Sequence, residues 1–366
     1  MAPDHALRTL RRAVHSFLVS IAAAVFLMLA LLTAPPIDAQ PRVTVVVGGL
    51  EVPWALAFAP DGRLFVTERP GRIRVVRDGR LDTQPVATLP VAARGEAGLM
   101  GLALDPGFAK NGRLYVCYTM SKRGGLVNRL SLLTLRDGRA GDERVLVDDM
   151  PGAGVHDGCR VKFGPDGKLY FTMGDAADTR LAQARDSLAG KILRLNADGS
   201  VPGDNPFPSS PIYTLGHRNP QGLAWDAAGR LYASEHGPSG FPGGHDELNL
   251  IRPGRNYGWP EVYGKAGKAG FEDPLLESGS RTWAPSGMAI LGGAAYIAAL
   301  RGQQLLRVGL GPDGAATGSS SLLDNTYGRL REAVVGPDGA LYVATSNRDG
   351  RGSPHLDDDR ILRLVP

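Results

Sequence analysis

Hydrophobic and polar residues alternate with a period of two over short stretches along most of the chain, as at Arg72–Val76 and Lys191–Leu195. This period places one face of a β-strand in a core and leaves the other face outside. Helical periodicity is convincing only around Thr179–Leu188, which we interpret as a helix within a loop. The pattern therefore predicts an all-β protein made of many short strands.

A glycine-x-leucine-aromatic motif recurs along the chain and introduces a strand each time. Sequences such as Ala-Pro-Asp-Gly and Gly-Pro-Asp-Gly precede most copies. They are expected to form tight turns, because proline presets one turn dihedral and glycine permits a positive φ. Six copies at a spacing of roughly 50–60 residues predict six four-stranded units, which is typical of a β-propeller. The copies begin at Gly62, Gly112, Gly167, Gly229, Gly339 and, in degenerate form, Gly293.

The two ends of the repeat region also read as strands. Arg360–Leu364 predicts a closing strand of the last blade, and Val43–Val47 is an apolar run suited to pair with the same blade and close the ring. Since no linker interrupts the pattern, we expect a single six-bladed propeller over residues 41–366. Loops of several blades would build a site at one end of its central channel. A β-sandwich or a pair of smaller domains is the alternative.

The N-terminus has the layout of a secretory signal. Three arginines precede an apolar run at Phe17–Leu32, and small residues follow up to Ala39. We therefore expect residues 1–39 to be a signal peptide and the mature protein to be periplasmic or secreted. The apolar run is slightly long for a signal peptide and short for a membrane span, so an uncleaved anchor is the alternative. Membrane contact is expected only in that case.

Composition narrows the function classes. The chain is 43% hydrophobic and 21% charged, and its net charge of +4 comes from scattered basic residues. Nucleic-acid surfaces concentrate their basic residues, so we expect no nucleic-acid partner. Cys117 and Cys159 are the two cysteines. In an oxidising compartment a bridge between them and two free buried thiols are both compatible with the sequence.

One loop carries a candidate general base. His156 precedes a strand, and Asp175 follows at the far end of the next strand. A neutral imidazole accepts a proton near neutral pH, and a carboxylate partner would fix its tautomer. If the fold brings them together, His156 would be a general base and Asp175 its carboxylate partner. A surface or packing histidine is the alternative.

Other loops offer groups for anions and cations. Arg218 lies in a dense polar stretch at residues 214–223, and its planar fork suits an anionic or carbonyl oxygen. Glu247 and nearby Gly-Pro carbonyls are hard oxygen ligands suited to calcium, although a polar loop with a salt bridge explains them too. Arg329 and Arg331 share one strand face and would repel unless an anion lies between them. This predicts an acidic ligand, with a solvated strand face as the alternative.

From about Leu50 to the C-terminus, these motifs resemble the soluble pyrroloquinoline quinone (PQQ)-dependent aldose sugar dehydrogenases, the glucose/sorbosone dehydrogenase family. The resemblance implies a six-bladed propeller, which agrees with the repeat count. The motifs that carry it are GHRNPQGL at 216–223, SEHGP at 234–238, DELNLI at 246–251, NYGWP at 256–260 and GRLREAVVGPDG at 328–339.

The resemblance also implies a mechanism and a set of site residues. His156 would remove the proton of the anomeric hydroxyl of an aldose while a hydride passes to PQQ, which yields a lactone. Asp175 would orient the histidine, and Arg218 would stabilise the oxygen of the reduced quinone. An external electron acceptor would then be needed. The implied cofactor contacts are Glu96, Arg218, Asn219, Thr282, Arg301, Arg329 and Arg331.

Two calcium ions are implied as well. The carbonyls of Gly237 and Pro238 would hold the ion at the quinone, and Glu247 with the carbonyl of Tyr257 would hold a structural ion. Three positions depart from the well-known soluble glucose dehydrogenase of the family, in which glutamine, lysine and glutamine occupy them. They are Glu96, Arg301 and His236.

Two other functions are compatible with a propeller. A calcium-dependent lactonase-type hydrolase would place Asp, Glu and Asn around one axial ion, and it makes little use of paired arginines. A non-catalytic secreted propeller that binds protein or glycan would keep the repeat without needing His156, Asp175 and Arg218 together. The sugar dehydrogenase is the function that the sequence favours.

Overall fold

The computed structural model describes residues 41–240 and 243–365, and Arg42–Val365 form one compact unit. The expected signal peptide at residues 1–39 lies outside the described residues. Within them, no helix has the length and apolar character needed to cross a membrane.

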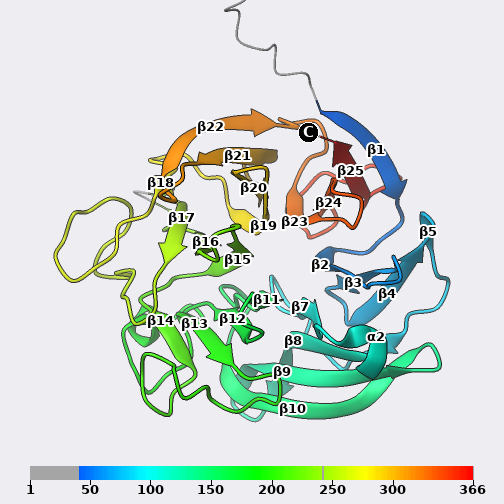
Figure 1. The fold of residues 1–366 in the computed structure, drawn as a ribbon, viewed down its shortest axis with the longest axis horizontal. Helices are drawn as coiled ribbons and strands as arrows, with labels where there is room; N and C mark the ends of the chain where they lie inside the picture. The colour runs from blue at the N-terminus through cyan, green and yellow to red at the C-terminus, as the bar shows by residue number, and fades with distance from the viewer. Residues whose placement is uncertain (1–40, 241–242, 366) are drawn as a thin grey trace, which may run out of the picture. The chain divides into compact units, whose positions relative to one another are not determined.

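The described chain folds into six antiparallel sheets, which confirms the all-β, six-bladed propeller predicted from the repeat (Figure 1). Each blade uses consecutive strands, except that the last blade also takes the N-terminal strand. Blade 1 contains β2 (Pro53–Phe58), β3 (Leu64–Glu68), β4 (Arg72–Arg77), β5 (Arg80–Leu81) and β6 (Ala87–Thr88), and blade 2 contains β7 (Leu99–Leu104), β8 (Arg113–Lys122), β9 (Gly125–Arg136) and β10 (Arg139–Gly152).

The remaining blades follow in the same way. Blade 3 contains β11 (Val161–Phe163), β12 (Leu169–Met173), β13 (Lys191–Leu195) and β14 (Ile212–Leu215), and blade 4 contains β15 (Pro220–Trp225), β16 (Leu231–Glu235), β17 (Glu247–Ile251) and β18 (Leu276–Glu277). Blade 5 contains β19 (Pro285–Leu291), β20 (Ala294–Ala299), β21 (Gln304–Leu310) and β22 (Ala316–Leu322), and blade 6 contains β23 (Leu330–Val335), β24 (Leu341–Thr345), β25 (Ile361–Val365) and β1 (Arg42–Val47).

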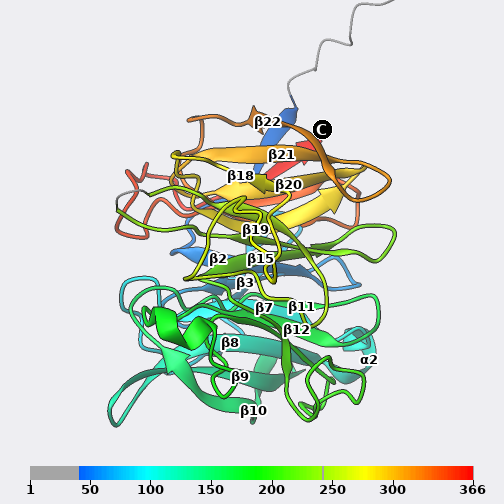
Figure 2. The same ribbon diagram turned by 90° about the vertical axis from the view of Figure 1, so that its left-hand side faces the viewer.

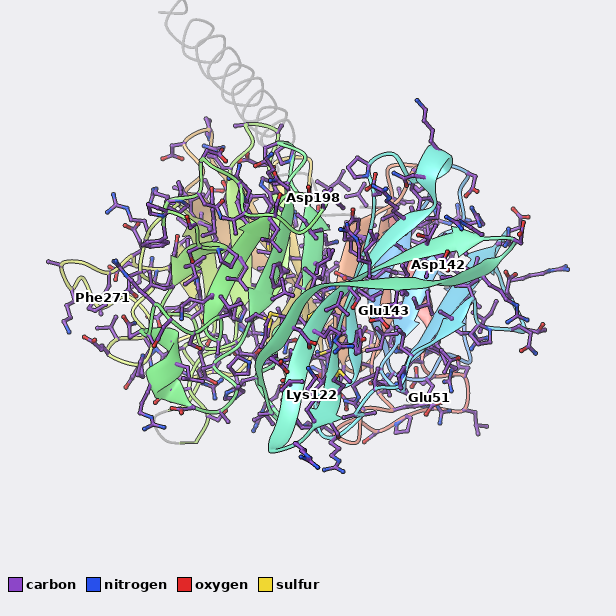
Figure 3. All side chains as sticks on the ribbon, turned by 90° about the horizontal axis from the view of Figure 1, so that it is seen from below. Glu51, Lys122, Asp142, Glu143, Asp198 and Phe271 are labelled. Atoms are coloured by element: carbon purple, nitrogen blue, oxygen red, sulfur yellow. A yellow bond between two sulfur atoms is a disulfide. The ribbon has the colours of Figure 1, made fainter. Side chains whose placement is uncertain are left out.

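The innermost strands form the closed centre of the ring. Each contacts the next in the order β2, β7, β11, β15, β19 and β23, and β23 returns to β2 (Figures 1 and 2). Burial falls toward the outer strands, as β10 shows with its exposed Asp142 and Glu143 (Figure 3). The apolar core therefore lies between neighbouring blades around the inner strands.

The recurrent sequence motif has one structural role. In every blade it begins the second strand, namely β3, β8, β12, β16, β20 or β24. In four blades the motif's tyrosine donates its hydroxyl hydrogen bond to an aspartate of the preceding turn, at 3.0–3.2 Å. Each of these hairpins is thus fixed by a turn aspartate and a strand tyrosine, which explains why the two recur together.

The predicted closure of the ring is confirmed. β1 pairs antiparallel with β25, and Val43 lies opposite Leu364. Because the first strand of the chain completes the last blade, the two ends of the described chain hold the ring shut.

The predicted helix around Thr179–Leu188 is much shorter in the structure. One 3₁₀ turn, η1 (Thr179–Ala182), is present, and with α2 (Phe108–Asn111) it is the helical content of the described residues. The Lys191 ammonium donates to the carbonyls of Leu181 and Ala182, which therefore do not continue a helical ladder. A buried tertiary contact thus overrides the local pattern.

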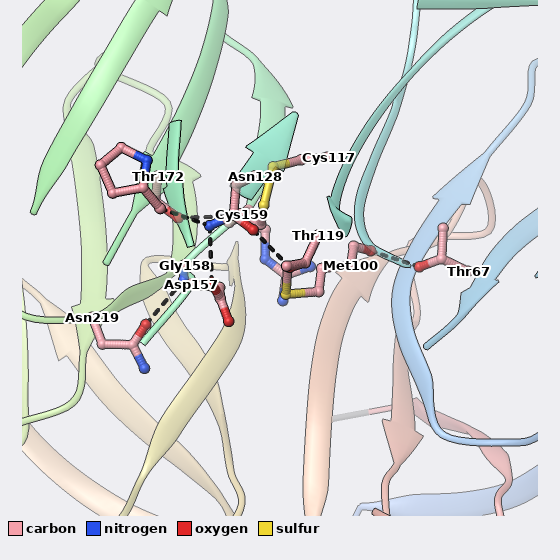
Figure 4. The surroundings of a disulfide bond; sticks show 12 residues. Thr67, Met100, Cys117, Thr119, Asn128, Asp157, Gly158, Cys159, Thr172 and Asn219 are labelled. Carbon is pink, nitrogen blue, oxygen red and sulfur yellow. Dashed lines mark hydrogen bonds between the residues drawn. A yellow bond between two sulfur atoms is a disulfide. The ribbon is translucent and has the colours of Figure 1, made fainter. Parts of the chain in front are cut away.

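Cys117 and Cys159 form a disulfide, which decides between the two alternatives that the sequence allows. It joins strand β8 of blade 2 to the segment just before β11 of blade 3 (Figure 4). Both half-cystines are fully buried. The bridge therefore ties two neighbouring blades at the segment that carries His156.

We expect the double variant Cys117→Ala/Cys159→Ala to lose about 2–4 kcal/mol of unfolding free energy, because the bridge closes a loop across a sequence separation of 42. Urea denaturation followed by circular dichroism measures the loss. Wild-type protein treated with a thiol reductant is the control and should lose a similar amount. An unchanged unfolding midpoint in both samples would contradict a stabilising bridge.

Candidate active site

The loops at one end of the ring converge because of the strand order within a blade. The start of a first strand and the end of the second strand lie side by side in an antiparallel pair. His156 and Arg218 precede the first strands β11 and β15, whereas Asp175 and Arg301 follow the second strands β12 and β20. Residues far apart in sequence are thereby brought to the same end of the ring.

A cavity of about 870 Å³ lies among these loops. Three candidates, Asp175, Asn219 and Arg331, are buried and do not line it, and Glu247 and Tyr257 do not line it either. The candidates that line the cavity are Glu96, His156, Arg218, Gly237, Pro238, Thr282, Arg301 and Arg329.

His156 and Asp175 form the pair that the sequence predicted from their positions. The His156 Nδ1 atom lies 2.8 Å from Asp175 Oδ1, and the carboxylate is fully buried behind the ring. The indole Nε1 of Trp259 donates to the other oxygen, Oδ2, also at 2.8 Å. A carboxylate only accepts, so Nδ1 carries a proton, and in the neutral form of the ring the lone pair is on Nε2.

The backbone at His156 is unusual. Its φ is +60°, in the left-handed region that few residues other than glycine adopt. The main chain of His156 packs so closely on Gly174 that a side chain at position 174 would collide with the His156 carbonyl. The main-chain N–H of His156 donates to Glu96 Oε2 at 3.2 Å. Tertiary contacts therefore hold this conformation, as is common where a loop serves a site.

Arg218 is placed by a second acid behind the cavity. The Glu235 carboxylate accepts from the main-chain N–H of Arg218 and lies 2.8 Å from Nδ1 of His217. The Arg218 guanidinium donates to Ser239 Oγ at 3.0 Å and lies 5.4 Å from the centre of the Trp259 ring. Burial lowers the pKa of Arg218 from its ordinary value. A buried guanidinium still carries its charge at neutral pH, so Arg218 is a fixed cation at the cavity.

Arg329, just before β23, and Arg331, within β23, both lie near the carboxylate of Asp349. Asp349 Oδ2 accepts from Arg329 Nε at 2.8 Å and lies 3.8 Å from Arg331 Nη2. Arg331 is also bound by Gln221 Oε1 at 2.9 Å, and burial lowers its pKa to about 9. One carboxylate thus separates two guanidinium groups, so the cavity keeps a surplus of positive charge on this side.

Several buried polar atoms around the cavity have no hydrogen-bond partner among the described residues. They include donors at Arg331 Nε, Asn219 Nδ2 and Arg69 Nε, and the ring Nε2 of His236. Unpaired buried donors are costly and call for a ligand that accepts hydrogen bonds. A quinone with three carboxylates offers many such acceptors, so the donor set fits PQQ.

The groups that could hold a calcium ion at the cavity are the carbonyls of the turn at Gly237 and Pro238. Gly237 and Pro238 line the cavity beside Asp246, whose carboxylate accepts from the N–H of Gly237 at 2.9 Å. A side chain at position 237 would collide with the carbonyls of Gly244 and His245, so this turn requires glycine. Among the described residues, no group of three His, Cys, Asp or Glu side chains could hold a metal. Backbone carbonyls, as calcium accepts, would have to complete the coordination.

The expected structural ion would lie apart from the cavity. Glu247 on β17 lies opposite Glu235 on β16. Burial, and to a smaller extent the charge of Glu235, raises the pKa of Glu247 to about 8. Its oxygens accept from Gly264 N at 2.8 Å and Asn249 Nδ2 at 3.0 Å. Two buried acids side by side suit a cation. The calcium assignment of Glu247 and Tyr257 stays a prediction.

Four residues of the site were not singled out from the sequence. Trp259 lies in the quoted NYGWP motif, and Glu235 lies in SEHGP, so their motifs were visible but their roles were not. Asp349 and Arg351 lie in a loop between β24 and β25 that has no periodic pattern. Their partners are Arg329 and Glu96, which only the closed ring brings near.

The chain is similar to known sugar dehydrogenases. The sequence model of the Glucose / Sorbosone dehydrogenase family matches residues 50–362. An aldose sugar dehydrogenase of Escherichia coli is 32% identical over 82% of this chain and 89% of its own length. Quinoprotein glucose dehydrogenase B of Acinetobacter calcoaceticus is 36% identical over 62% of this chain, which spans about half (54%) of that relative.

A solved structure is similar throughout the ring. The PQQ-bound form of aldose sugar dehydrogenase from Streptomyces coelicolor is 41% identical and superposes with a TM-score of 0.82. The match covers 90% of this chain and 99% of that one.

The carboxyl of Asp157, next to His156 in the sequence, should make the unfolding free energy depend on pH. It accepts from Asn128 Nδ2 and from the N–H of Ala153, both at 2.9 Å, while its Oδ2 atom is buried without a partner among the described residues (Figure 4). Burial raises the pKa of Asp157 to about 7. The fold thus favours the protonated carboxyl. The unfolding free energy should fall as the pH rises from about 4 to about 7, and stay lower above it.

We expect Asp157→Asn to flatten this dependence, because the amide keeps the Oδ1 acceptor and never ionises. At pH 8 the variant should exceed the wild type by up to about 4 kcal/mol, and at pH 4 the two should be close. Urea denaturation at both pH values measures this, with the exposed Asp142→Asn as control. If the wild type were more stable than Asp157→Asn by the same unfolding free energy at both pH values, the raised pKa would be contradicted.

Proposed function

This chain belongs to the glucose/sorbosone dehydrogenase family, and we propose that it is a periplasmic or secreted quinoprotein that oxidises aldose sugars at the anomeric carbon to lactones. PQQ and calcium would be its cofactors, and an external electron acceptor would reoxidise it. The observation that carries the proposal is the His156–Asp175 pair, placed at a cavity with fixed arginines and unpaired donors.

His156 is suited to act as the base. Asp175 accepts from Nδ1–H of His156, so the lone pair of Nε2 is free to take the hydroxyl proton of the sugar. Trp259 holds the second oxygen of Asp175 and thereby restricts rotation of the carboxylate. A base with a single tautomer and a fixed ring direction loses little freedom when the reaction begins.

When bound, PQQ would supply the electrophilic two-electron acceptor for the hydrogen that leaves the anomeric carbon. Arg218 would stabilise the negative charge that grows on an oxygen in the cavity, because its guanidinium is already held by Ser239 and the Trp259 ring. A charge that is oriented beforehand needs no reorganisation during the reaction.

The rest of the cavity would bind and orient the cofactor. Arg329 lines the cavity and would take a carboxylate of the cofactor. The unpaired Arg331 Nε and Asn219 Nδ2 lie behind the lining and would donate to the cofactor after a local shift of the residues in front of them. Thr282 and Arg301 also line the cavity and would add donors. The carbonyls of Gly237 and Pro238 would hold calcium, which would polarise the reacting carbonyl of the quinone.

The two rival functions have less support. A lactonase-type hydrolase would make little use of the arginines that line this cavity, Arg218, Arg301 and Arg329. A non-catalytic propeller gives no role to the hydrogen-bonded chain His156–Asp175–Trp259 at the cavity. The disulfide agrees with an oxidising compartment, which supports the proposed location.

We expect His156→Asn to keep PQQ affinity within about threefold and to lower kcat by roughly 10²–10⁴-fold, the range for loss of a general base. Asparagine tolerates the left-handed backbone at this position, so the loop should survive. Dye reduction with an aldose measures kcat, and titration of the apoprotein measures affinity. The exposed His355→Asn is the control. Full turnover in His156→Asn would remove His156 from the mechanism.

Calcium removal gives a separate test of the metal. We expect a chelator to abolish dye reduction and to weaken PQQ binding at least tenfold, because the carbonyls of Gly237 and Pro238 would hold a calcium ion that polarises the quinone. Added calcium should restore both, and magnesium should restore them poorly since it binds backbone carbonyls reluctantly. Unchanged PQQ affinity in chelator-treated protein would contradict a calcium ion at the quinone.

A further inference from the structure

An ion pair joins two distant loops at the rim of the cavity. Arg351 Nη1 lies 2.5 Å from Glu96 Oε1. Glu96 belongs to the loop before β7 in blade 2, and Arg351 belongs to the loop between β24 and β25 in blade 6. The Glu96 side chain is only 14% exposed, whereas Arg351 is 53% exposed. Both residues line the cavity.

The second oxygen of Glu96 reaches the catalytic loop. Glu96 Oε2 accepts from the main-chain N–H of His156 at 3.2 Å, at the residue whose φ is +60°. The main-chain N–H of Glu96 in turn donates to the carbonyl of Gly154 at 2.8 Å. The loop before β7 and the His156 loop are therefore bonded through both side chain and backbone of one residue.

The charge of Glu96 is out of place beside an acidic ligand. Burial alone would raise its pKa, but the Arg351 guanidinium bonded to Glu96 Oε1 lowers it, so the carboxylate is ionised. A bare carboxylate in this cavity would repel a quinone that carries three carboxylates. Arg351 supplies the opposite charge at the same place.

We propose that Glu96 and Arg351 act as a positioning pair, in which Glu96 fixes the main chain of His156 and Arg351 cancels the charge of Glu96 so that an anionic quinone can bind beside it. The inference rests on the proposed function for its ligand, PQQ. It explains why an acid is compatible with this position, and it assigns a role to an arginine in a loop without any pattern.

Binding of PQQ to the calcium-loaded apoprotein tests the charge balance without any turnover. Arg351→Gln should raise the Kd about tenfold or more, and Glu96→Gln should lower it by about three- to tenfold. In the double variant both charges are gone, so the Kd should return to within about threefold of the wild type. Arg136→Gln is the matched control, since Arg136 pairs with Asp142 on exposed strands away from the cavity and should leave the Kd unchanged.

The role of Glu96 at His156 is tested with a rescue. Glutamine at position 96 keeps an acceptor for the His156 N–H, whereas alanine removes it. We expect kcat of Glu96→Ala to be about tenfold below that of Glu96→Gln. Amide hydrogen exchange over residues 154–158 in the apoprotein should be faster in Glu96→Ala than in Glu96→Gln or Arg136→Gln.

These outcomes test the proposed role of the Glu96–Arg351 pair separately from the proposed function. If the wild type binds PQQ while Arg351→Gln leaves the Kd unchanged, or Glu96→Gln weakens binding, the charge role is overturned and the function stands. If the wild type with calcium binds no PQQ, the proposed function and the charge role both fail. In that case the exchange comparison still decides whether Glu96 positions the His156 loop.

Discussion

The site depends on the carboxylate of Asp175, which is held between two donors. His156 Nδ1 and Trp259 Nε1 each lie 2.8 Å from one of its oxygens, and the carboxylate is fully buried. The three residues come from three separate segments around the ring. Because the carboxylate fixes both the tautomer and the direction of the imidazole, the free Nε2 of His156 has one orientation toward the cavity.

Some of the cations at the cavity are paired with acids of the same chain and others are not. Arg329 is paired with Asp349, and Arg351 is paired with Glu96. Among the described residues, the Arg218 guanidinium is bonded to the Ser239 hydroxyl and lies near the Trp259 ring, without an acid in salt-bridge contact. The remaining positive charge and the unpaired donors would favour an acidic, acceptor-rich ligand. An acid at Glu96 is tolerated in such a cavity because its partner is close.

The fold was predictable because its signal is local and repeated. The turn before each copy of the motif sets a hairpin, and the aspartate and tyrosine that bond across it stand about four to ten residues apart in the sequence. The convergence of His156 and Asp175 also follows, since a first strand begins where a second strand ends. The helical pattern after Thr179 failed as a full helix because Lys191, from the next strand, binds its carbonyls.

Other parts of the site depend on contacts that no short pattern records. Arg351 and Glu96 are separated by 255 residues, and only the closure of the ring by β1 and β25 makes them neighbours. The anion between Arg329 and Arg331 was predicted as a ligand, whereas the structure already places Asp349 there. The sequence also did not decide whether Cys117 and Cys159 are bridged, because the bridge depends on the packing of two blades.

The central claim is that the cavity beside His156 is a quinone site. A crystal structure of the protein grown with calcium and PQQ tests it most directly. The account predicts that the quinone lies in this cavity, with carboxylates on Arg329 and its reacting face toward Nε2 of His156. A quinone bound elsewhere, or an empty cavity at saturating PQQ and calcium, would contradict it.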